Sequence, residues 1–395
     1  MTKSLNKLLV QRYWKYLLLV VIVISGMAFM DAFSGIKNWQ AVEQNQSRPE
    51  EREYFESRLK DDDTEVPGKV AYYDFKSGEE KFTDDFEEYK KSELQFTVRS
   101  YNTEEYAVNE FYSESSFYLV IILMVVGFLS FFLDLKTHFN TLLFSSRFTR
   151  KDIFIRKKVL ISGTLLVTLL LTKLIGVWVL KLAIPSEHFL VDMGPMMISV
   201  VTSTITLMTV YEIFAFAGMI MGEWVTAIGT LVAFWFSLPM ASDAIDRLVI
   251  IVKHYILGYS MREIDQGSWL DNGFVTYLND SPFDMKNVIL LLVVIAILII
   301  SAIYLYNKMG LDNNNEYLVF NGLKRPIQWV MISYITVILA TTGITDHLYV
   351  SNIEFSWIGF ALKVAFSLVL SYLLSQGLIY RKFKLGTKSI DLTRK

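Results

Sequence analysis

The sequence predicts an all-α polytopic membrane protein with about eight transmembrane helices and a small α+β extracytoplasmic domain between the first two helices. Hydrophobic residues make up 53% of the 395 residues, and the mean hydropathy is +0.36. The apolar residues come in blocks, and a helix needs roughly 20 such residues to cross a ~30 Å hydrocarbon core. A charged stretch of about eighty residues separates the first two blocks.

Eight blocks are long enough to cross a bilayer. They are residues 16–36, 116–134, 159–182, 195–221, 225–241, 287–306, 327–343 and 355–380. The first block has no small-residue cleavage site and too long an apolar core for a cleavable signal peptide. The chain contains no Cys, which excludes disulfides, thiol catalysis and Cys-ligated metals.

Basic residues fix the expected orientation. Residues 1–15 carry four and no acid, residues 135–158 carry seven against Asp152, and residues 381–395 carry six against Asp391. The short loops 183–194 and 344–356 carry acidic residues and no Lys or Arg. The positive-inside rule then places both termini and the loops 135–158 and 307–326 in the cytoplasm.

Residues 244–259 are apolar enough to suggest a ninth crossing. They contain Arg247 and Lys253, and each charge costs about 2.5–3.5 kcal/mol at a helix centre. We therefore expect an amphipathic or re-entrant helix on the outer face, with Pro239 ending or bending the span before it.

These assignments divide the chain into a series of segments. The order is a cytoplasmic amphipathic helix at 1–15, the first span at 16–36, the extracytoplasmic domain at 37–115, the second span at 116–134, a cytoplasmic loop at 135–158, spans three to five at 159–241, an outer re-entrant or amphipathic segment at 242–286, span six at 287–306, a cytoplasmic loop at 307–326, spans seven and eight at 327–380, and a basic cytoplasmic tail at 381–395.

The extracytoplasmic segment 37–115 carries 11 basic and 21 acidic residues, a net charge of −10. Its patterns predict helices at Arg48–Lys60 and Thr103–Glu114 and strands at Val70–Phe75 and Leu94–Tyr101. A turn is expected at Lys76–Glu79. The acidity is typical of a solvated surface, and attraction of cationic peptides is the alternative.

Residues 3–16 place apolar and basic side chains on opposite faces of a helix. Leu5, Leu8, Leu9, Tyr13 and Tyr16 share the apolar face. Such a helix is expected in the inner interface, with its ammonium groups toward lipid headgroups or a partner.

The cytoplasmic loop 136–158 predicts a helix, a break and a second helix. Phe139, Leu142 and Leu143 are expected on one apolar face. Thr149 followed by Asp152 is an N-cap signal for the helix that enters span three. The pattern is typical of a docking element for a cytoplasmic partner, and an ordinary positively charged loop remains the alternative.

The order of these features resembles the membrane subunits of ABC-2-type ATP-binding-cassette exporters, in particular the Gram-positive permeases with eight spans. Thr141–Leu143, followed by Thr149–Phe154 and Lys157, is similar to the coupling region of that family. Tyr306–Lys308 and Glu316–Phe320 are similar to its region after span six. The chain departs from the family pattern at Arg147 and Phe148, where a Pro and an aliphatic residue are common.

The resemblance implies a cell-membrane permease that moves an amphipathic peptide, lipid-like or antibiotic-type substrate outward. It implies two protein partners, a separate cytoplasmic ATPase that binds and hydrolyses the ATP and a second permease in a homo- or heterodimer. It also assigns ATPase coupling to Leu142, Leu143, Arg147, Arg150, Lys151 and Asp152. A polytopic sensor or resistance protein, which binds an extracellular ligand without transport, is the alternative function.

Four ionisable residues fall inside predicted spans, where each is a functional candidate. They are Asp31, Lys173, Glu212 and Lys363. Asp31 is expected at a depth comparable with Lys173 and Lys363 and pairs with either. Glu212 lies nearer the inner side with no obvious cation at its level, and it is expected to face a cavity, be protonated or bind the Thr209 hydroxyl. Structural pairing or snorkelling is the alternative for all four.

No enzymatic or nucleic-acid-binding pattern emerges from the sequence. The four His residues have no metal-ligand spacing, and neither a G-x-S-x-G elbow nor a G-x-x-x-x-G-K-[ST] phosphate loop occurs. We therefore expect no catalytic, cofactor-binding or metal-binding residues on this chain. The basic runs are explained by topology, so no nucleic-acid partner is expected.

Overall fold

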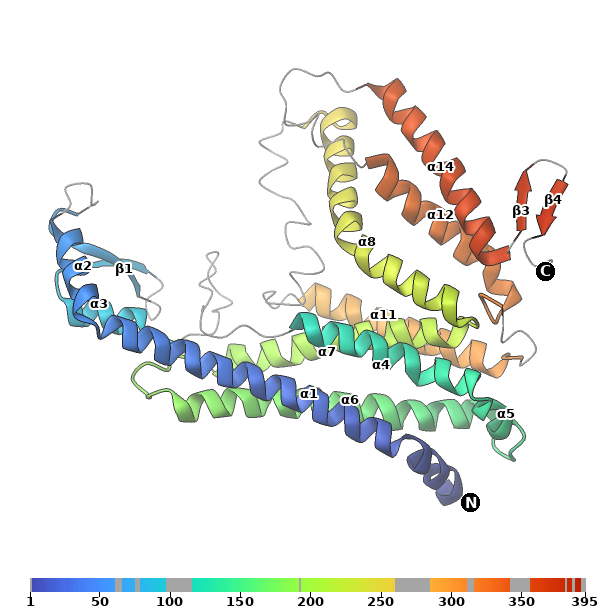
Figure 1. Ribbon diagram of the computed structural model, residues 1–395, viewed down its shortest axis with the longest axis horizontal. Helices are drawn as coiled ribbons and strands as arrows, with labels where there is room; N and C mark the ends of the chain where they lie inside the picture. Colours follow the sequence, from blue (N-terminus) through green and yellow to red (C-terminus); the bar gives the residue numbers. More distant parts are fainter. Residues whose placement is uncertain are drawn as a thin grey trace. The chain divides into compact units, whose positions relative to one another are not determined.

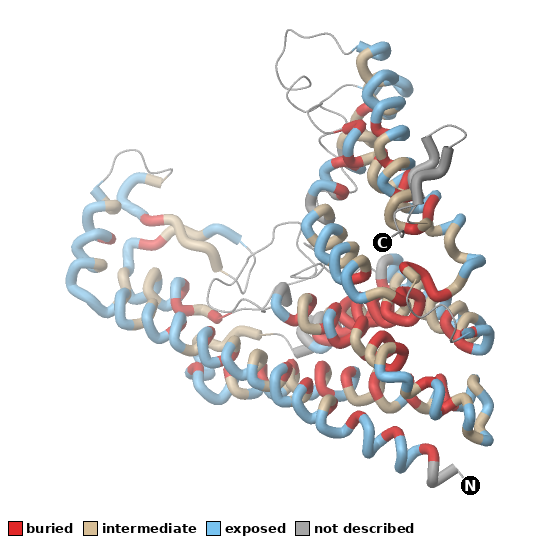
Figure 2. Tube along the Cα trace, turned by 45° about the vertical axis from the view of Figure 1, so that its right-hand side comes forward, coloured by how far each residue is buried: buried red, intermediate tan, exposed pale blue. Residues whose placement is uncertain are grey.

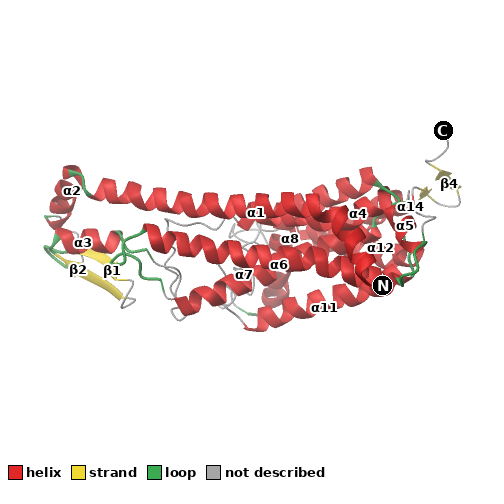
Figure 3. Cartoon of the chain, turned by 90° about the horizontal axis from the view of Figure 1, so that it is seen from below, coloured by secondary structure: helices red, strands yellow, loops and turns green. Residues whose placement is uncertain are grey.

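The computed structural model describes residues 2–60, 66–74, 79–96, 116–191, 193–259, 285–310, 316–341, 356–380, 382–385 and 388–391. Helices dominate these residues, with two small hairpins (Figure 3). The chain divides into two compact units. The first unit comprises Met1–Val126, Ile153–Glu212 and Leu278–Ile297, and the second comprises Gly127–Asp152, Ile213–Tyr277 and Leu298–Lys395.

Within the described residues, six helices are long and apolar enough to cross a membrane. They are Leu5–Gln46, Tyr118–Lys136, Arg150–Ala183, Val200–Ile220, Val288–Asn307 and Trp357–Tyr380. Six of the eight blocks found in the sequence coincide with them, so the chain is a polytopic membrane protein. The block 225–241 is also helical, in α8 (Trp224–Ile251), as is the described part of the block 327–343, in α12 (Lys324–Thr341). The apolar helix in α8 covers only Trp224–Ser237. The count of eight spans stays a prediction.

The first unit begins with α1 (Thr2–Gln46), a single helix of 45 residues. The segment 1–15 is helical as expected, but no break separates it from the span 16–36, so it is not an independent element. Leu5, Leu9 and Tyr13 are buried at helical spacing, whereas Leu8 is 36% exposed. The buried face is therefore narrower than the predicted apolar face.

Two further long helices pack in the first unit, α6 (Arg150–Ala183, in this unit from Ile153) and α7 (Met193–Ile220, in this unit to Glu212). The Arg156 guanidinium donates to Asn6 Oδ1 at 2.9 Å, so the start of α6 lies against the start of α1 (Figure 1). Lys173 donates to the Ser203 hydroxyl, which joins α6 to α7. No acidic residue occurs between residues 153 and 183.

The element predicted to be extracytoplasmic, called the outer element below, follows α1. It comprises α2 (Pro49–Leu59), β1 (Val70–Asp74), β2 (Glu79–Thr83) and α3 (Phe86–Glu93). The antiparallel strands pair from Val70 with Thr83 to Asp74 with Glu79. Figure 1 shows this element at the C-terminal end of α1. The predicted α+β character, the helix near 48–60 and the strand from Val70 are confirmed.

The partner strand in the outer element differs from the prediction. It is β2, whose sequence Glu-Glu-Lys-Phe-Thr lacks the apolar alternation of a strand. In the predicted strand Leu94–Tyr101, the described residues form only an isolated bridge from Phe96 to Phe189. The Asp85 side chain accepts the Glu87 N–H and starts α3, which occupies the chain up to Glu93. The predicted helix Thr103–Glu114 lies outside the described residues.

A small apolar cluster fixes the outer element to the ends of α1 and α6. Ala32, Trp39, Phe96, Leu180 and Ile184 are buried together. The Trp39 indole donates to the Leu94 carbonyl at 2.9 Å, and the Phe96 ring stacks on Phe189 with centroids 5.5 Å apart.

The second unit contains the C-terminal ends of three helices that begin in the first unit, namely α4 (whole helix Ser116–Lys136), α7 and α11 (whole helix Met285–Asn307). It also contains α5 (Phe139–Phe144), α8, the π-helix η1 (Val252–Ile256), the 3-10 helix η2 (Asn321–Leu323), α12 and α14 (Trp357–Tyr380). The chain in α8 continues through Pro239 to Ile251, so Pro239 does not end the helix. The expected separate helix at 244–259 is instead the end of α8 and η1.

Polar side chains join α12 to α14. Ser367, Ser371 and Ser375 are buried on one face of α14. Figure 2 shows that buried and exposed residues alternate along the helices. The hydroxyls of Thr336 and Ser371 are 2.9 Å apart, and Gln328 donates to Ser375 at 3.4 Å. Hydroxyl groups at helical spacing are a common means of packing helices in membranes.

The basic tail 381–395 contains an antiparallel hairpin that was not predicted. It consists of β3 (Lys382–Leu385) and β4 (Lys388–Asp391), with Lys382 paired to Asp391. The composition of the segment indicated only its charge.

Candidate functional site

The candidate site with most sequence support is the coupling element, which we define as residues 137–152 in the second unit. Its central helix, α5, begins after His138, whose φ of 54° is the left-handed conformation. That conformation turns the chain sharply. The turn comes directly after α4, since only one residue separates His138 from Lys136 at the end of that helix. The turn places α5 beside the end of α11.

The inner face of α5 is held by polar and aromatic contacts. Asn140 is 2% exposed, accepts a hydrogen bond from the Tyr306 hydroxyl at 3.3 Å and donates to Met309 Sδ at 3.8 Å. The rings of Phe144 and Tyr306 meet edge to face at 5.4 Å. These contacts orient α5 firmly on the end of α11.

The two leucines of α5 have opposite environments. Leu143 is 1% exposed, whereas Leu142 is 56% exposed. Phe139, Leu142 and Leu143 are three and four residues apart and lie on one side of the helix. Of the two leucines, only Leu143 is buried against the protein. Leu142 alone is the exposed apolar group of this helix.

Arg150 is a structural residue of the same element. Its guanidinium donates to the carbonyls of Asn307 at 3.1 Å and Met309 at 2.8 Å, and it lies 4.5 Å from the centroid of the Phe144 ring. A cation at the C-terminal end of a helix satisfies carbonyls that have no partner within the helix. Arg150 therefore caps the C-terminal end of α11.

The N-cap predicted at the start of α6 is confirmed. The Asp152 N–H donates to the Thr149 hydroxyl at 3.1 Å, and that hydroxyl donates to Asp152 Oδ2 at 2.6 Å. Asp152 is thus occupied in the cap. Among the predicted coupling residues, Leu142, Arg147, Lys151 and Asp152 are exposed, and Leu143 and Arg150 are not.

A second polar assembly, in the first unit, lies around Glu212. Its carboxylate forms an ion pair with Lys158, and the Ser162 hydroxyl donates to it at 3.4 Å. Lys158 also lies 4.7 Å from the centroid of the Tyr211 ring. Glu212 is 4% exposed and Lys158 is 9% exposed. The expectation that Glu212 lacks a cation is wrong.

Lys158 was missed because it was counted with the cytoplasmic charges of the loop 135–158. Its position along the helix, compared with that of Glu212, could have identified it as the partner. Lys158 lies eight residues into α6 and Glu212 lies eight residues before the end of α7, which is ~12 Å from a helix end in each case. Thr209, the hydroxyl suggested as a partner, donates instead to the carbonyl of Ile205 at 2.9 Å.

The other intramembrane residues are placed as follows. Lys173 is 9% exposed and bonds Ser203. Asp31 is partly buried on α1, and its pairing with Lys173 or Lys363 stays a prediction. Lys363 is exposed on α14, between Leu362 at 66% and Phe366 at 70% exposed.

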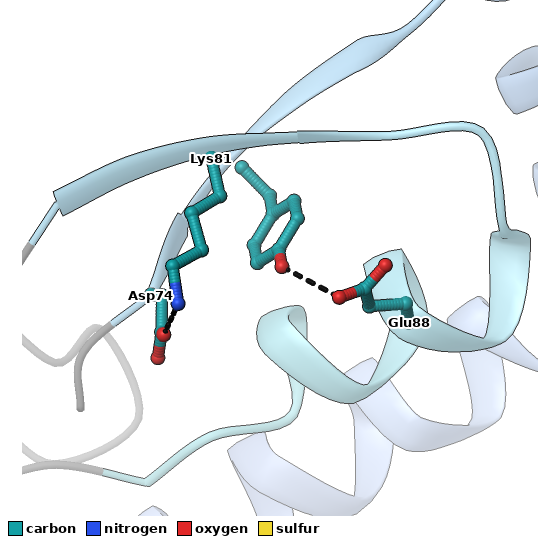
Figure 4. A network of polar contacts seen from close by, with 4 residues as sticks. Asp74, Lys81 and Glu88 are labelled. Carbon is teal, nitrogen blue, oxygen red and sulfur yellow. Dashed lines mark hydrogen bonds and ion pairs between the residues drawn. The ribbon is translucent and has the colours of Figure 1, made fainter. Parts of the chain in front are cut away.

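The outer element carries a polar network of its own (Figure 4). The Tyr72 hydroxyl donates to Glu88 at 2.8 Å, the Thr83 hydroxyl donates to the same carboxylate at 2.5 Å, and Lys81 pairs with Asp74 at 2.5 Å. The bonds from Thr83 and Tyr72 lower the pKa of Glu88. Burial, followed by the bond to Glu88, raises the pKa of Tyr72 to about 12. The network ties the hairpin to α3.

Comparison of the chain with protein-family models, with curated proteins and with solved structures found no match in any of the three. Among the described residues, no group of three His, Asp or Glu is placed to hold a metal ion.

Proposed function

We propose that the chain is the permease subunit of an ATP-driven ABC-2-type exporter, paired with a second permease and with a separate cytoplasmic ATPase. It moves an amphipathic peptide, lipid-like or antibiotic-type substrate outward. The chain itself carries no ATP-binding or catalytic residues in this proposal. Residues 137–152 transmit the motion of the ATPase to the membrane helices.

The observation that carries the proposal is the construction of the coupling element. Leu142 offers one exposed apolar side chain, and the exposed cations Arg147 and Lys151 follow it in the sequence. Behind it, Asn140 and Arg150 fasten the element to the end of α11. The exposed residues are apolar and basic and can contact a partner, while the buried contacts with α11 can transmit a movement of that partner to the helix.

The test uses two exposed residues, because changes at Leu143 or Arg150 would disturb the fold. Leu142→Asp removes the apolar contact and Lys151→Glu reverses a charge. The full chain is tagged, purified in mild detergent, and assayed for a co-purifying ATPase with a phosphate-binding loop and vanadate-sensitive ATP hydrolysis. We expect both variants to lose most of the associated ATPase while remaining monodisperse.

Leu257→Asp is the matched control. Leu257 is 61% exposed, close to the 56% of Leu142, and lies after α8 in the segment predicted outside the cytoplasm. It should keep the associated ATPase. If all three variants retain the same ATPase activity, residues 137–152 do not couple a partner, and a sensor that works without an ATPase becomes the better function.

A further inference from the structure

A groove of about 350 Å³ lies in the first unit between the N-terminal parts of α1 and α6. Val10 on α1 and Ile155, Val159 and Leu160 on α6 give it mainly apolar walls. Asn6 and Arg156 also line it and are joined by their hydrogen bond. Neither residue belongs to the coupling element or to the ion pair of Glu212.

The apolar walls are open to the surroundings. Val10 is 46%, Ile155 37% and Val159 67% exposed. The apolar surface continues along α6, where Leu166 is 40% and Val167 54% exposed. Gly163 lies between these residues on α6, and no atom lies within 4 Å of the position that its Cβ would take, so the space beside it is open.

The length of this surface matches one leaflet. From Arg156 to Val167 is eleven residues, or ~16 Å of helix, and half of a ~30 Å hydrocarbon core is ~15 Å. Both helices are candidate spans, so hydrocarbon chains surround such a surface in a bilayer. A single acyl chain fits along it in length and chemistry.

The charges around the groove are of one sign. Residues 2–30 and 153–183 contain no acidic residue, whereas Lys7 on α1 is exposed and Arg156 lies in the groove wall. The preceding acid on α6, Asp152, is bonded to Thr149. The bond to Asn6 uses one of the five N–H donors of the guanidinium, and Arg readily binds phosphate through paired donors.

We propose that this groove binds one anionic phospholipid of the cytoplasmic leaflet, with its phosphate on Arg156 and one acyl chain along Val159 and Leu160. Basic pockets between membrane helices on the cytoplasmic side bind such headgroups in general. The lipid adds a contact between α1 and α6 beside the hydrogen bond from Arg156 to Asn6. It is independent of the exporter proposal.

The test is lipid binding by native mass spectrometry of the full chain in detergent. The probes are dioleoylphosphatidylglycerol, dioleoylphosphatidylcholine and glycerol 3-phosphate. We expect one tightly bound phosphatidylglycerol, at least about tenfold weaker phosphatidylcholine, and no binding of glycerol 3-phosphate at the same concentration. Arg156→Gln should weaken phosphatidylglycerol binding about tenfold or more. Arg156→Lys, which keeps the charge but loses the paired donors, should weaken it less than Arg156→Gln does. Val159→Trp fills the groove and should weaken both lipids.

Two residues of α12 provide matched controls. Arg325→Gln removes an exposed Arg, and Val330→Trp enlarges a Val that is 67% exposed, as is Val159. Neither should alter the bound lipid. Equal affinity for the two lipids, or unchanged binding in Arg156→Gln, overturns the proposal. So does binding of glycerol 3-phosphate at the affinity of phosphatidylglycerol, or a change in oligomeric state in Val159→Trp with lipid binding intact.

Discussion

At the scale of single residues, Glu212 and Lys158 illustrate how charge is kept inside the helices. The carboxylate is 4% exposed and contacts both the lysine and the Ser162 hydroxyl. A buried ion pair contributes little relative to apolar residues, but removal of one partner leaves an uncompensated charge. The loss of either side chain is therefore expected to disturb the packing of α6 against α7.

A double-mutant cycle tests this pair. Lys158→Met should destabilise the protein by about 3–5 kcal/mol, because Glu212 loses its counter-ion, and Lys158→Met with Glu212→Gln should recover much of the loss. Thermal unfolding in detergent measures both. Lys181→Met, at an exposed lysine of α6, is the control and should have little effect. Strictly additive losses would mean that the two side chains are not coupled.

The network of the outer element makes a prediction about pH. The pKa of Glu88 is lowered by the hydroxyls of Thr83 and Tyr72, so its contribution to stability is complete above the ordinary Glu pKa of about 4.3. It is lost as pH falls through the lower folded pKa. We expect the labelled Glu88 carboxyl to titrate below about pH 4.3 by carbon NMR, and closer to that value in Tyr72→Phe and Thr83→Val. Glu88→Gln identifies the signal, and titration at an unchanged pH in both variants would show that these bonds are absent.

At the scale of elements, α4 and α7 approach closely within the second unit. A Cβ built on Gly218 would lie 2.1 Å from the carbonyl oxygen of Phe128, so only Gly permits this contact. Gly218→Ala should destabilise by about 1–3 kcal/mol, since the backbones must separate. Gly229→Ala on α8 is the control, because nothing lies within 4 Å of its Cβ position. It should be neutral or stabilising by up to about 1 kcal/mol, and equal effects at the two sites would contradict the close approach.

The elements that the sequence predicts well are those with strong local signals. The long apolar blocks and the Thr149–Asp152 cap were recognisable because hydrophobicity and N-cap chemistry are local. The second strand, Glu79–Thr83, was not recognisable, because its polar sequence is held by pairing with β1 and by Glu88 on α3. Pro239 does not end α8, which excludes one of the two effects predicted for it and leaves the bend.

The candidate site was predictable in position but not in the role of each residue. Composition located the coupling element, yet Leu142 and Leu143 differ only in which of them faces α11. Arg150 resembles its exposed neighbour Lys151 in sequence, and its capping role depends on the end of α11, more than 150 residues away. Such long-range contacts leave no local pattern.

At the scale of the whole molecule, the absence of Cys allows a direct test of topology. Single cysteines replace exposed residues at Ser47, Ser145, Glu187, Gly310 and Ser356. The positive-inside rule predicts that a membrane-impermeant maleimide labels Ser47→Cys, Glu187→Cys and Ser356→Cys in intact cells. Ser145→Cys and Gly310→Cys should be labelled only after permeabilisation. External labelling of Ser145→Cys would contradict the cytoplasmic position of the coupling element.

The continuity of α1 has a mechanical consequence. At 1.5 Å per residue, its 45 residues extend ~68 Å, well beyond a ~30 Å hydrocarbon core. One end contributes Val10 to the groove beside α6, and the other carries the outer element. A rigid rod of that length amplifies small rotations, so a tilt of ~5° about one end displaces the other by ~6 Å. Slight repacking near Val10 would thus become a much larger displacement of the element at the other end of α1.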